Sequence, residues 1–195
     1  MIRKRRLPPW ALPLFTAIAS LTCGGESLVL PSEGVPSELR YVGGDGQIDT
    51  VGNPLNDPLV VQVLDSRARP VQNQPVAFSL ILGGTGADLI PDTALTDVDG
   101  KAQSRWVLGR IAGSQTVQAR VLATGAAGSL TRNFSATALA DSADTLVMVR
   151  GQAQTGVVGT PLADSLVVKV TDRFGNPIAG SVVTWAPIGG GSLND

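Results

Sequence analysis

Short runs of alternating apolar and polar residues dominate the chain after its first forty positions. Leu59, Val61 and Val63 occupy every second position of residues 58–64, and the same alternation runs through residues 117–121. A period of two is that of a β-strand with one buried face. After the first forty positions no stretch sustains the spacing of three and four that an amphipathic helix needs. The pattern therefore predicts an all-β protein.

Further strand-like runs cover residues 75–82, 101–108 and 129–139, most of them bounded by glycine, proline or aspartate. About seven short strands in roughly 100 residues is typical of an immunoglobulin-like sandwich. We therefore expect two packed sheets.

The chain also repeats itself at an offset of 107 residues without a gap. Residues 51–65 (VGNPLNDPLVVQVLD) match residues 158–172 (VGTPLADSLVVKVTD), and Phe78 falls on Trp185. A fixed offset indicates copies of one structural unit. We predict one Ig-like β-sandwich at 39–140 and, at 141–195, the N-terminal half of a second, incomplete one. A half sandwich leaves an apolar face uncovered, so we expect a fragment of a longer protein in which more copies can follow.

Residues 1–22 have the features of an export signal. Arg3 to Arg6 are basic, and the apolar stretch at 7–21 is shorter than the roughly 20 residues of a membrane-spanning helix. Glycine and proline recur in residues 23–38, which we predict to be a tether.

Cys23 follows the apolar stretch and precedes two glycines, an arrangement that resembles the lipid-attachment site of bacterial lipoproteins. Ser20 and Thr22 depart from that pattern. The competing cut after Ala17-Ile18-Ala19 has the small-x-small form that releases a soluble protein. Lipidation of Cys23 is the favoured interpretation, and it predicts a membrane partner through the anchor.

Composition removes several function classes. The chain has no histidine and one cysteine, so histidine-dependent triads, imidazole metal ligands and multi-thiolate zinc sites are excluded. Cleavage of the signal removes four of the 15 basic residues and none of the 16 acidic ones, which takes the net charge from −1 to about −5. That charge disfavours nucleic acid as a partner. We expect no catalytic residues, no metal and no cofactor.

The punctuation of the second copy is specific. Residues 172–180 (DRFGNPIAG) and 182–185 (VVTW), with 96–102 (TDVDGKA) in the first copy, resemble group 1 bacterial Ig-like domains of the invasin and intimin type. The resemblance covers most of residues 39–195 and implies a stalk or adhesive module at a bacterial surface, with no catalytic residues. Residues 66–70 lack the Gly-Asn pair of residues 175–176, which leaves open whether the two turns agree.

Two sets of carboxylates need weighing. Asp97 and Asp99 precede Gly100 as in a calcium loop, but Leu108 stands where the bidentate glutamate belongs, so a hairpin turn with φ > 0 at the glycine is favoured. Asp65 and Asp172 share one repeat position. An acid/base pair is the alternative there, and side chains that bond nearby backbone amides are favoured.

Among the aromatic residues, Phe78 and Trp185 share a repeat position in a predicted strand, so we expect both to pack in a core. Trp106 is predicted to be a core residue too, and a soluble carbohydrate-binding module that uses Trp106 is the alternative.

These observations predict a non-enzymatic, exported bacterial surface protein, anchored by lipid in the outer membrane, whose Ig-like repeats act as a stalk or adhesion module. Its ligand, a surface protein or a glycan, stays unidentified. The alternative from another class is that the modules are spacers of a larger secreted hydrolase.

Overall fold

Strands are the regular elements of the computed structural model, which describes residues 34–122 and 129–193. The predicted signal peptide, Cys23 and the tether up to residue 33 lie outside the described residues. Within the two described ranges, no helix is long and apolar enough to cross a bilayer.

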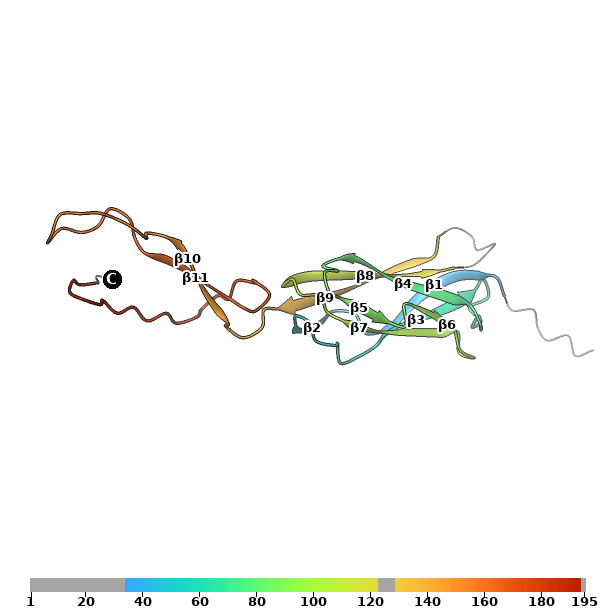
Figure 1. Ribbon diagram of the computed structural model, residues 1–195. Helices are drawn as coiled ribbons and strands as arrows, with labels where there is room; N and C mark the ends of the chain where they lie inside the picture. The colour runs from blue at the N-terminus through green and yellow to red at the C-terminus, as the bar shows by residue number, and fades with distance from the viewer. Residues whose placement is uncertain (1–33, 123–128, 194–195) are drawn as a thin grey trace, which may run out of the picture. The chain divides into compact units, whose positions relative to one another are not determined.

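The first module contains the strands labelled β1 to β9 in Figure 1. Their bounds are β1 Pro36–Gly43, β2 Gln47–Thr50, β3 Leu59–Asp65, β4 Pro75–Leu82, β5 Asp88–Ile90, β6 Thr93–Leu95, β7 Lys101–Val107, β8 Gly113–Val121 and β9 Thr131–Leu139. The strands form two sheets, with the orders β1-β3-β7-β5 and β2-β9-β8-β4-β6. All pairs are antiparallel except β2–β9.

This strand order is that of an immunoglobulin-like sandwich. The first sheet has the order of strands A-B-E-D, and β4, β8 and β9 of the second take the places of C, F and G. The structure therefore confirms the all-β, Ig-like prediction. The two short strands β2 and β6 extend the second sheet at its two edges.

The core lies between the sheets because alternate residues of each strand point inward. Leu59, Val61 and Val63 of β3 are fully buried, as are Val117 and Ala119 of β8. Phe78 and Trp106 are buried too, as the pattern predicts for core residues. These side chains and their neighbours form one continuous apolar cluster.

The first strand begins earlier than predicted. Residues 36–38 were expected in the tether, but Pro36 already pairs with Asp65 of β3. Proline lacks a backbone donor, which suits the first position of a strand at a sheet edge. Because β1 is such an edge strand, the proline and the two residues after it belong to the sandwich.

The turn at residues 96–100 is also different from the prediction. Gly100 has a φ of 71°, and Asp97 Oδ1 accepts hydrogen bonds from the amides of Asp99 and Lys101. The tight turn with a left-handed glycine is therefore present. It is not a hairpin, however, because it links β6 in one sheet to β7 in the other. The carboxylates stabilise the turn itself.

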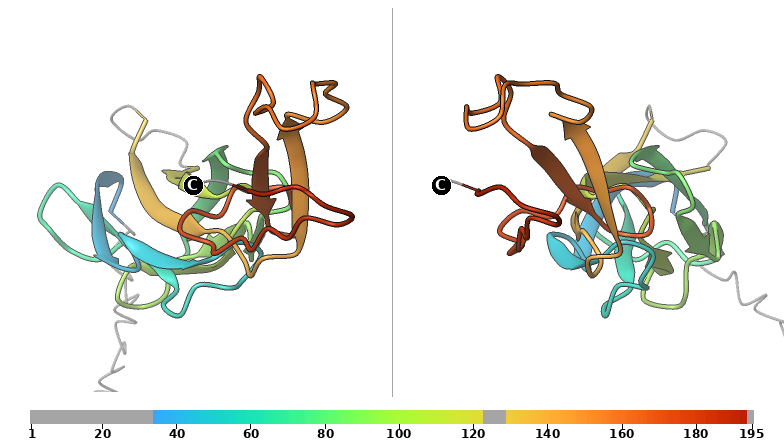
Figure 2. Two further views of the ribbon diagram at one scale, coloured as in Figure 1. Left: turned by 90° about the vertical axis from the view of Figure 1, so that its left-hand side faces the viewer. Right: turned by 60° about the vertical axis from the view of Figure 1, so that its left-hand side comes forward.

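The second module has two strands among its described residues, β10 (Thr145–Arg150) and β11 (Val167–Thr171), which pair antiparallel. Figure 2 shows them side by side, joined by a long loop. Trp185 lies outside any strand and is 41% exposed, so the prediction that it packs in a core like Phe78 is wrong for this structure. Phe78 is covered by β8, and residues 141–193 contain no strand equivalent to β8.

The repeat extends to individual side-chain hydrogen bonds. Gln47 bonds the carbonyl oxygens of Gly44 and Asp57 and accepts from the amide of Asp57. Gln154 makes the same three bonds 107 residues later, with Gly151 and Asp164. Each glutamine clamps the loop before its module's next long strand. The two copies therefore share local architecture where both are folded.

Candidate functional site

The described residues bring together no catalytic constellation at the positions weighed above. Trp106 has no exposed surface, so a glycan cannot stack on its ring and that alternative is wrong. In the ranges 34–122 and 129–193, no three acidic, histidine or cysteine side chains gather where they could hold a metal ion. What the structure does bring together is a junction between the two modules.

The junction is built on the turn after β11. Asp172 Oδ1 accepts hydrogen bonds from the amides of Phe174 (2.9 Å) and Asn176 (2.8 Å). The amide of Gly175 donates to the Asp172 carbonyl, with a left-handed φ of 85° at the glycine. An aspartate that caps its own turn in this way fixes the direction of the residues that follow it.

The first module has the same turn after β3, despite its different sequence. Asp65 Oδ1 accepts from the amides of Arg67 (2.8 Å) and Arg69 (2.9 Å), and Ala68 has a φ of 59°. The question left open by the missing Gly-Asn pair is thus answered, since the two turns agree. Ala68 accepts a conformation that costs a non-glycine residue about 1 kcal/mol.

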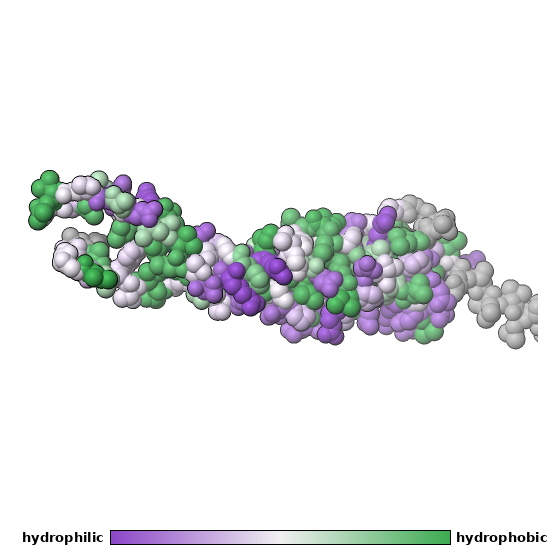
Figure 3. All heavy atoms as spheres, viewed as in Figure 1, coloured by the Kyte–Doolittle hydropathy of each residue, from purple (hydrophilic) through white to green (hydrophobic). Residues whose placement is uncertain are grey.

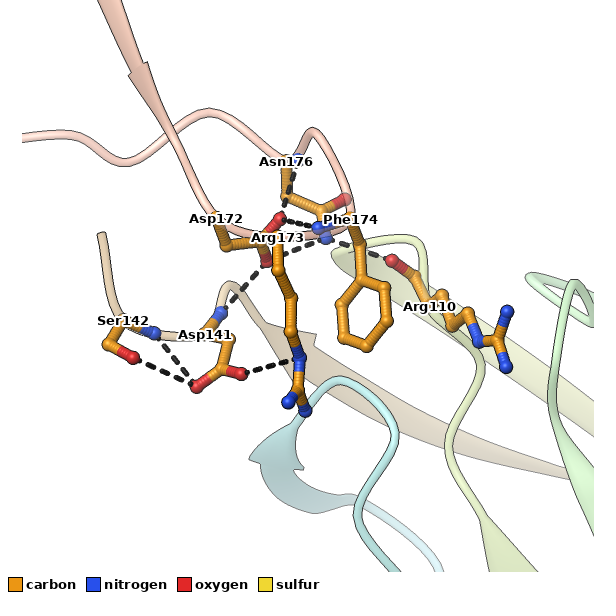
Figure 4. Close-up of polar contacts among 7 residues, drawn as sticks. All are labelled: Arg110, Asp141, Ser142, Asp172, Arg173, Phe174 and Asn176. Carbon is orange, nitrogen blue, oxygen red and sulfur yellow. Dashed lines mark hydrogen bonds and ion pairs between the residues drawn. The ribbon is translucent and has the colours of Figure 1, made fainter. Parts of the chain in front are cut away.

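The two turns differ in what their fifth residue contacts. Arg69 folds back on its own turn and pairs with Asp65 at 2.7 Å. Asn176 instead bonds the first module: its Nδ2 donates to the carbonyl of Arg110 (2.8 Å), and its Oδ1 accepts from the amide of Ala112 (2.9 Å). Figure 4 shows Asn176 beside Asp172, with its bond to Arg110. One amide side chain thus joins two modules.

The loop that receives Asn176 is held in shape from inside the first module. Gln115 of β8 is fully buried; its Oε1 accepts from the amide of Gly109, and its Nε2 donates to the carbonyls of Gly109 and Ile111. Gly109 also lies directly against the carbonyl oxygen of Gly83, where a side chain would not fit. The receiving backbone groups are therefore fixed by the first module's own core.

The second carboxylate oxygen of Asp172 ties the linker to the turn. Asp172 Oδ2 accepts from the amide of Asp141 (3.0 Å) and from Asn176 Nδ2 (2.8 Å). The Asp141 carboxylate pairs with Arg173 at 3.2 Å. These contacts close a ring of charged and polar groups around the short segment between β9 and β10 (Figure 4).

Phe174 supplies the apolar part of the junction. It is partly buried and packs against the first module's core cluster. The guanidinium of Arg173 lies 4.7 Å from the ring centroid and that of Arg110 lies 5.7 Å away. A cation over an aromatic face contributes about 0.5–1 kcal/mol at exposed sites. The side chain therefore combines apolar packing with two favourable charge contacts.

Hydrogen bonding controls the ionisation of the turn aspartates. Burial acts to raise the pKa of Asp172, but the hydrogen bonds from Asn176, Asp141 and Phe174 outweigh it and lower the pKa to about 2. The backbone hydrogen bond from Arg69 is the largest influence on Asp65 and lowers its pKa as well. Both carboxylates are ionised at neutral pH and already accept several bonds. They are structural groups and not a general acid/base pair.

Comparisons with known proteins place these features as follows. No protein-family model and no curated protein matches the chain. Among solved structures, the chain is similar to the Escherichia coli adhesin FdeC (18% identity, TM-score 0.43) and to Yersinia pseudotuberculosis InvD (15%, 0.41). It is also similar to domains 4–9 of the surface layer protein SbsC (12%, 0.37).

The similar region takes in 75%, 72% and 74% of this chain but only 44%, 42% and 21% of those three chains, in the same order. The Ig-like assignment therefore rests on the strand order of the first module. The closer resemblance to group 1 domains stays a prediction.

Proposed function

We propose that the chain is a non-enzymatic bacterial surface protein, in which Ig-like modules act as a stalk or adhesion module. In this proposal the protein is exported, and lipid on Cys23 holds it in the outer membrane. A surface protein or glycan is the ligand class that such a stalk would present itself to.

The observation that carries the proposal is the junction. A stalk transmits position only if successive modules keep their geometry, and a free linker would lose it. Asn176 and Phe174 both contact the first module, and Asp172 holds the linker residue Asp141. These contacts support a function in which the connection between modules matters more than any single side chain's chemistry.

The stiffness of the junction can be tested by 15N relaxation of the full chain. We expect amides of β8 and β11 to report one shared rotational correlation time. Asn176→Ala removes both side-chain bonds to the loop at 110–112, and Phe174→Ala removes the apolar contact. The double variant should give the two modules different correlation times.

Arg69→Ala is the matched control, because Arg69 holds the equivalent position but contacts its own turn. It should leave the correlation times equal. If the unaltered chain already shows independent tumbling, the stalk proposal is wrong.

The anchor is tested separately. Replacement of Cys23 by alanine should abolish incorporation of labelled palmitate and release the protein from the membrane fraction. Membrane association that persists in Cys23→Ala would overturn the lipid anchor and leave the stalk proposal standing.

A further inference from the structure

Strand β11 has a free edge where its counterpart in the first module is paired. Strand β3 lies between β1 and β7, whereas β11 pairs with β10 alone in the described structure. Apolar side chains lie open on the surface around β10 and β11, as Figure 3 shows. The repeat therefore shows what kind of element covers this strand when the fold is closed.

The direction of the backbone groups follows from the same comparison. In the first module Val61 pairs with Ala102 and Leu59 with Ser104, and the amide of Val63 donates toward the β7 side, to Gly100 (2.8 Å). Hydrogen-bonding groups alternate along a strand, so the amide of Val61 faces β7 as well. Val168 matches Val61 at the repeat offset, which places its amide and carbonyl on the free edge.

An open pocket of about 540 Å³ adjoins that edge. It lies between the loop that contains Thr160 and Leu162 and the segment 191–193. In the first module the corresponding space is filled by the end of β7 and the residues after it. Leu55 there bonds Trp106, Asn53 bonds Leu108, Gly52 bonds Gly109, and Thr85 bonds Arg110, all through the backbone.

We propose that the free edge of β11 and this pocket together form an acceptor site for one extended peptide strand of the β7 type. The strand runs antiparallel to β11, with small residues opposite Leu166 and Val168 and a large apolar residue entering the pocket at Leu162. The strand comes from outside residues 34–193, since β7 itself is held between β3 and β5. The inference does not depend on the proposed stalk function.

The test uses the full chain and a fluorescent peptide with the sequence of residues 101–110 (KAQSRWVLGR). We expect saturable binding in fluorescence anisotropy. Methylation of the peptide nitrogens at the positions of Ala102 and Ser104 removes donors that face β11. It should weaken binding by about tenfold or more, because two backbone hydrogen bonds are lost.

Methylation at the positions of Gln103 and Arg105 is the matched control. Those amides face away from β11, so affinity should stay within about twofold. On the protein, Leu162→Asp should weaken binding, whereas Val182→Asp should not, because Val182 is almost fully exposed and does not line the pocket.

Three results would overturn the acceptor site. One is the absence of binding up to about millimolar peptide, and another is equal affinity for the two methylated peptides. The third is sedimentation of the full chain as a dimer that dissociates with Leu162→Asp, because a second copy would then be the occupant.

Discussion

The two modules carry the same residues at matching positions and bury them to very different extents. Leu39, Leu55 and Leu59 are 1%, 2% and 0% exposed. Their partners Leu146, Leu162 and Leu166 are 56%, 52% and 39% exposed. The local strand pairing is nevertheless alike, since Leu39 faces Val63 as Leu146 faces Val170.

The difference teaches that hairpin geometry in this repeat is local, whereas burial is supplied by the second sheet. Strands β4, β8 and β9 cover the inner face of β3 in the first module. Two paired strands alone form a register but cannot exclude water from either face.

The largest expected effect comes from truncating one leucine in each module. Leu59→Ala should lower the free energy of unfolding of the first module by about 2–5 kcal/mol, because it leaves a cavity in a close-packed core. Leu166→Ala should change it by less than about 0.5 kcal/mol, since its site is open to water. Urea denaturation of the full chain, followed by circular dichroism, measures both. Equal effects would contradict the comparison.

A smaller effect is expected from acid. The pKa of Asp172 is lowered to about 2 from an ordinary value near 3.8, so its stabilising contribution is complete above about pH 4. As the pH falls from about 4 to 2 the carboxylate is protonated and that contribution is lost. The amide chemical shifts of Asp141 and Asn176 should therefore move together in this range, as NMR can measure.

Asp172→Asn provides the check on that titration. Its amide nitrogen would meet the donors of Asp141 and Asn176, so the junction should be loosened at neutral pH and the acid step should vanish. A step of unchanged size would assign the titration to another carboxylate.

The smallest effect concerns the residue with positive φ in each turn. Ala68→Gly should stabilise the first module by about 0.5–1 kcal/mol by relieving strain at φ 59°. Gly175→Ala should destabilise the turn after β11 by about 1 kcal/mol. Thermal unfolding and amide exchange of Asn176 measure the two. Opposite signs would show that the turns are not equivalent.

Local alternation made the longer strands predictable. The run at 75–82 coincides with β4, because a strand with one buried face shows its period in the sequence. Strands β5 and β6 have three residues each, too few to show a period. Gln47 and Gln154 were missed although the repeat offset aligns them, and that alignment was the signal that could have found their shared clamp.

The junction could not have been predicted in the same way. Asn176 bonds backbone groups of Arg110 and Ala112, which are 66 and 64 residues away. Backbone atoms are the same for every residue type, so the sequence holds no mark of the partner. The paired turns at Asp65 and Asp172 were expected from the residues, but which turn would reach a neighbouring module depended on tertiary placement.

The buried amide of Gln115 has a consequence for biogenesis. It shapes the receiving loop with contacts that lie wholly inside the first module, so the socket is complete before any later residue arrives. A polypeptide that emerges amino end first can then seat each new unit on a finished predecessor. Growth of such an array needs no rearrangement of what has already folded.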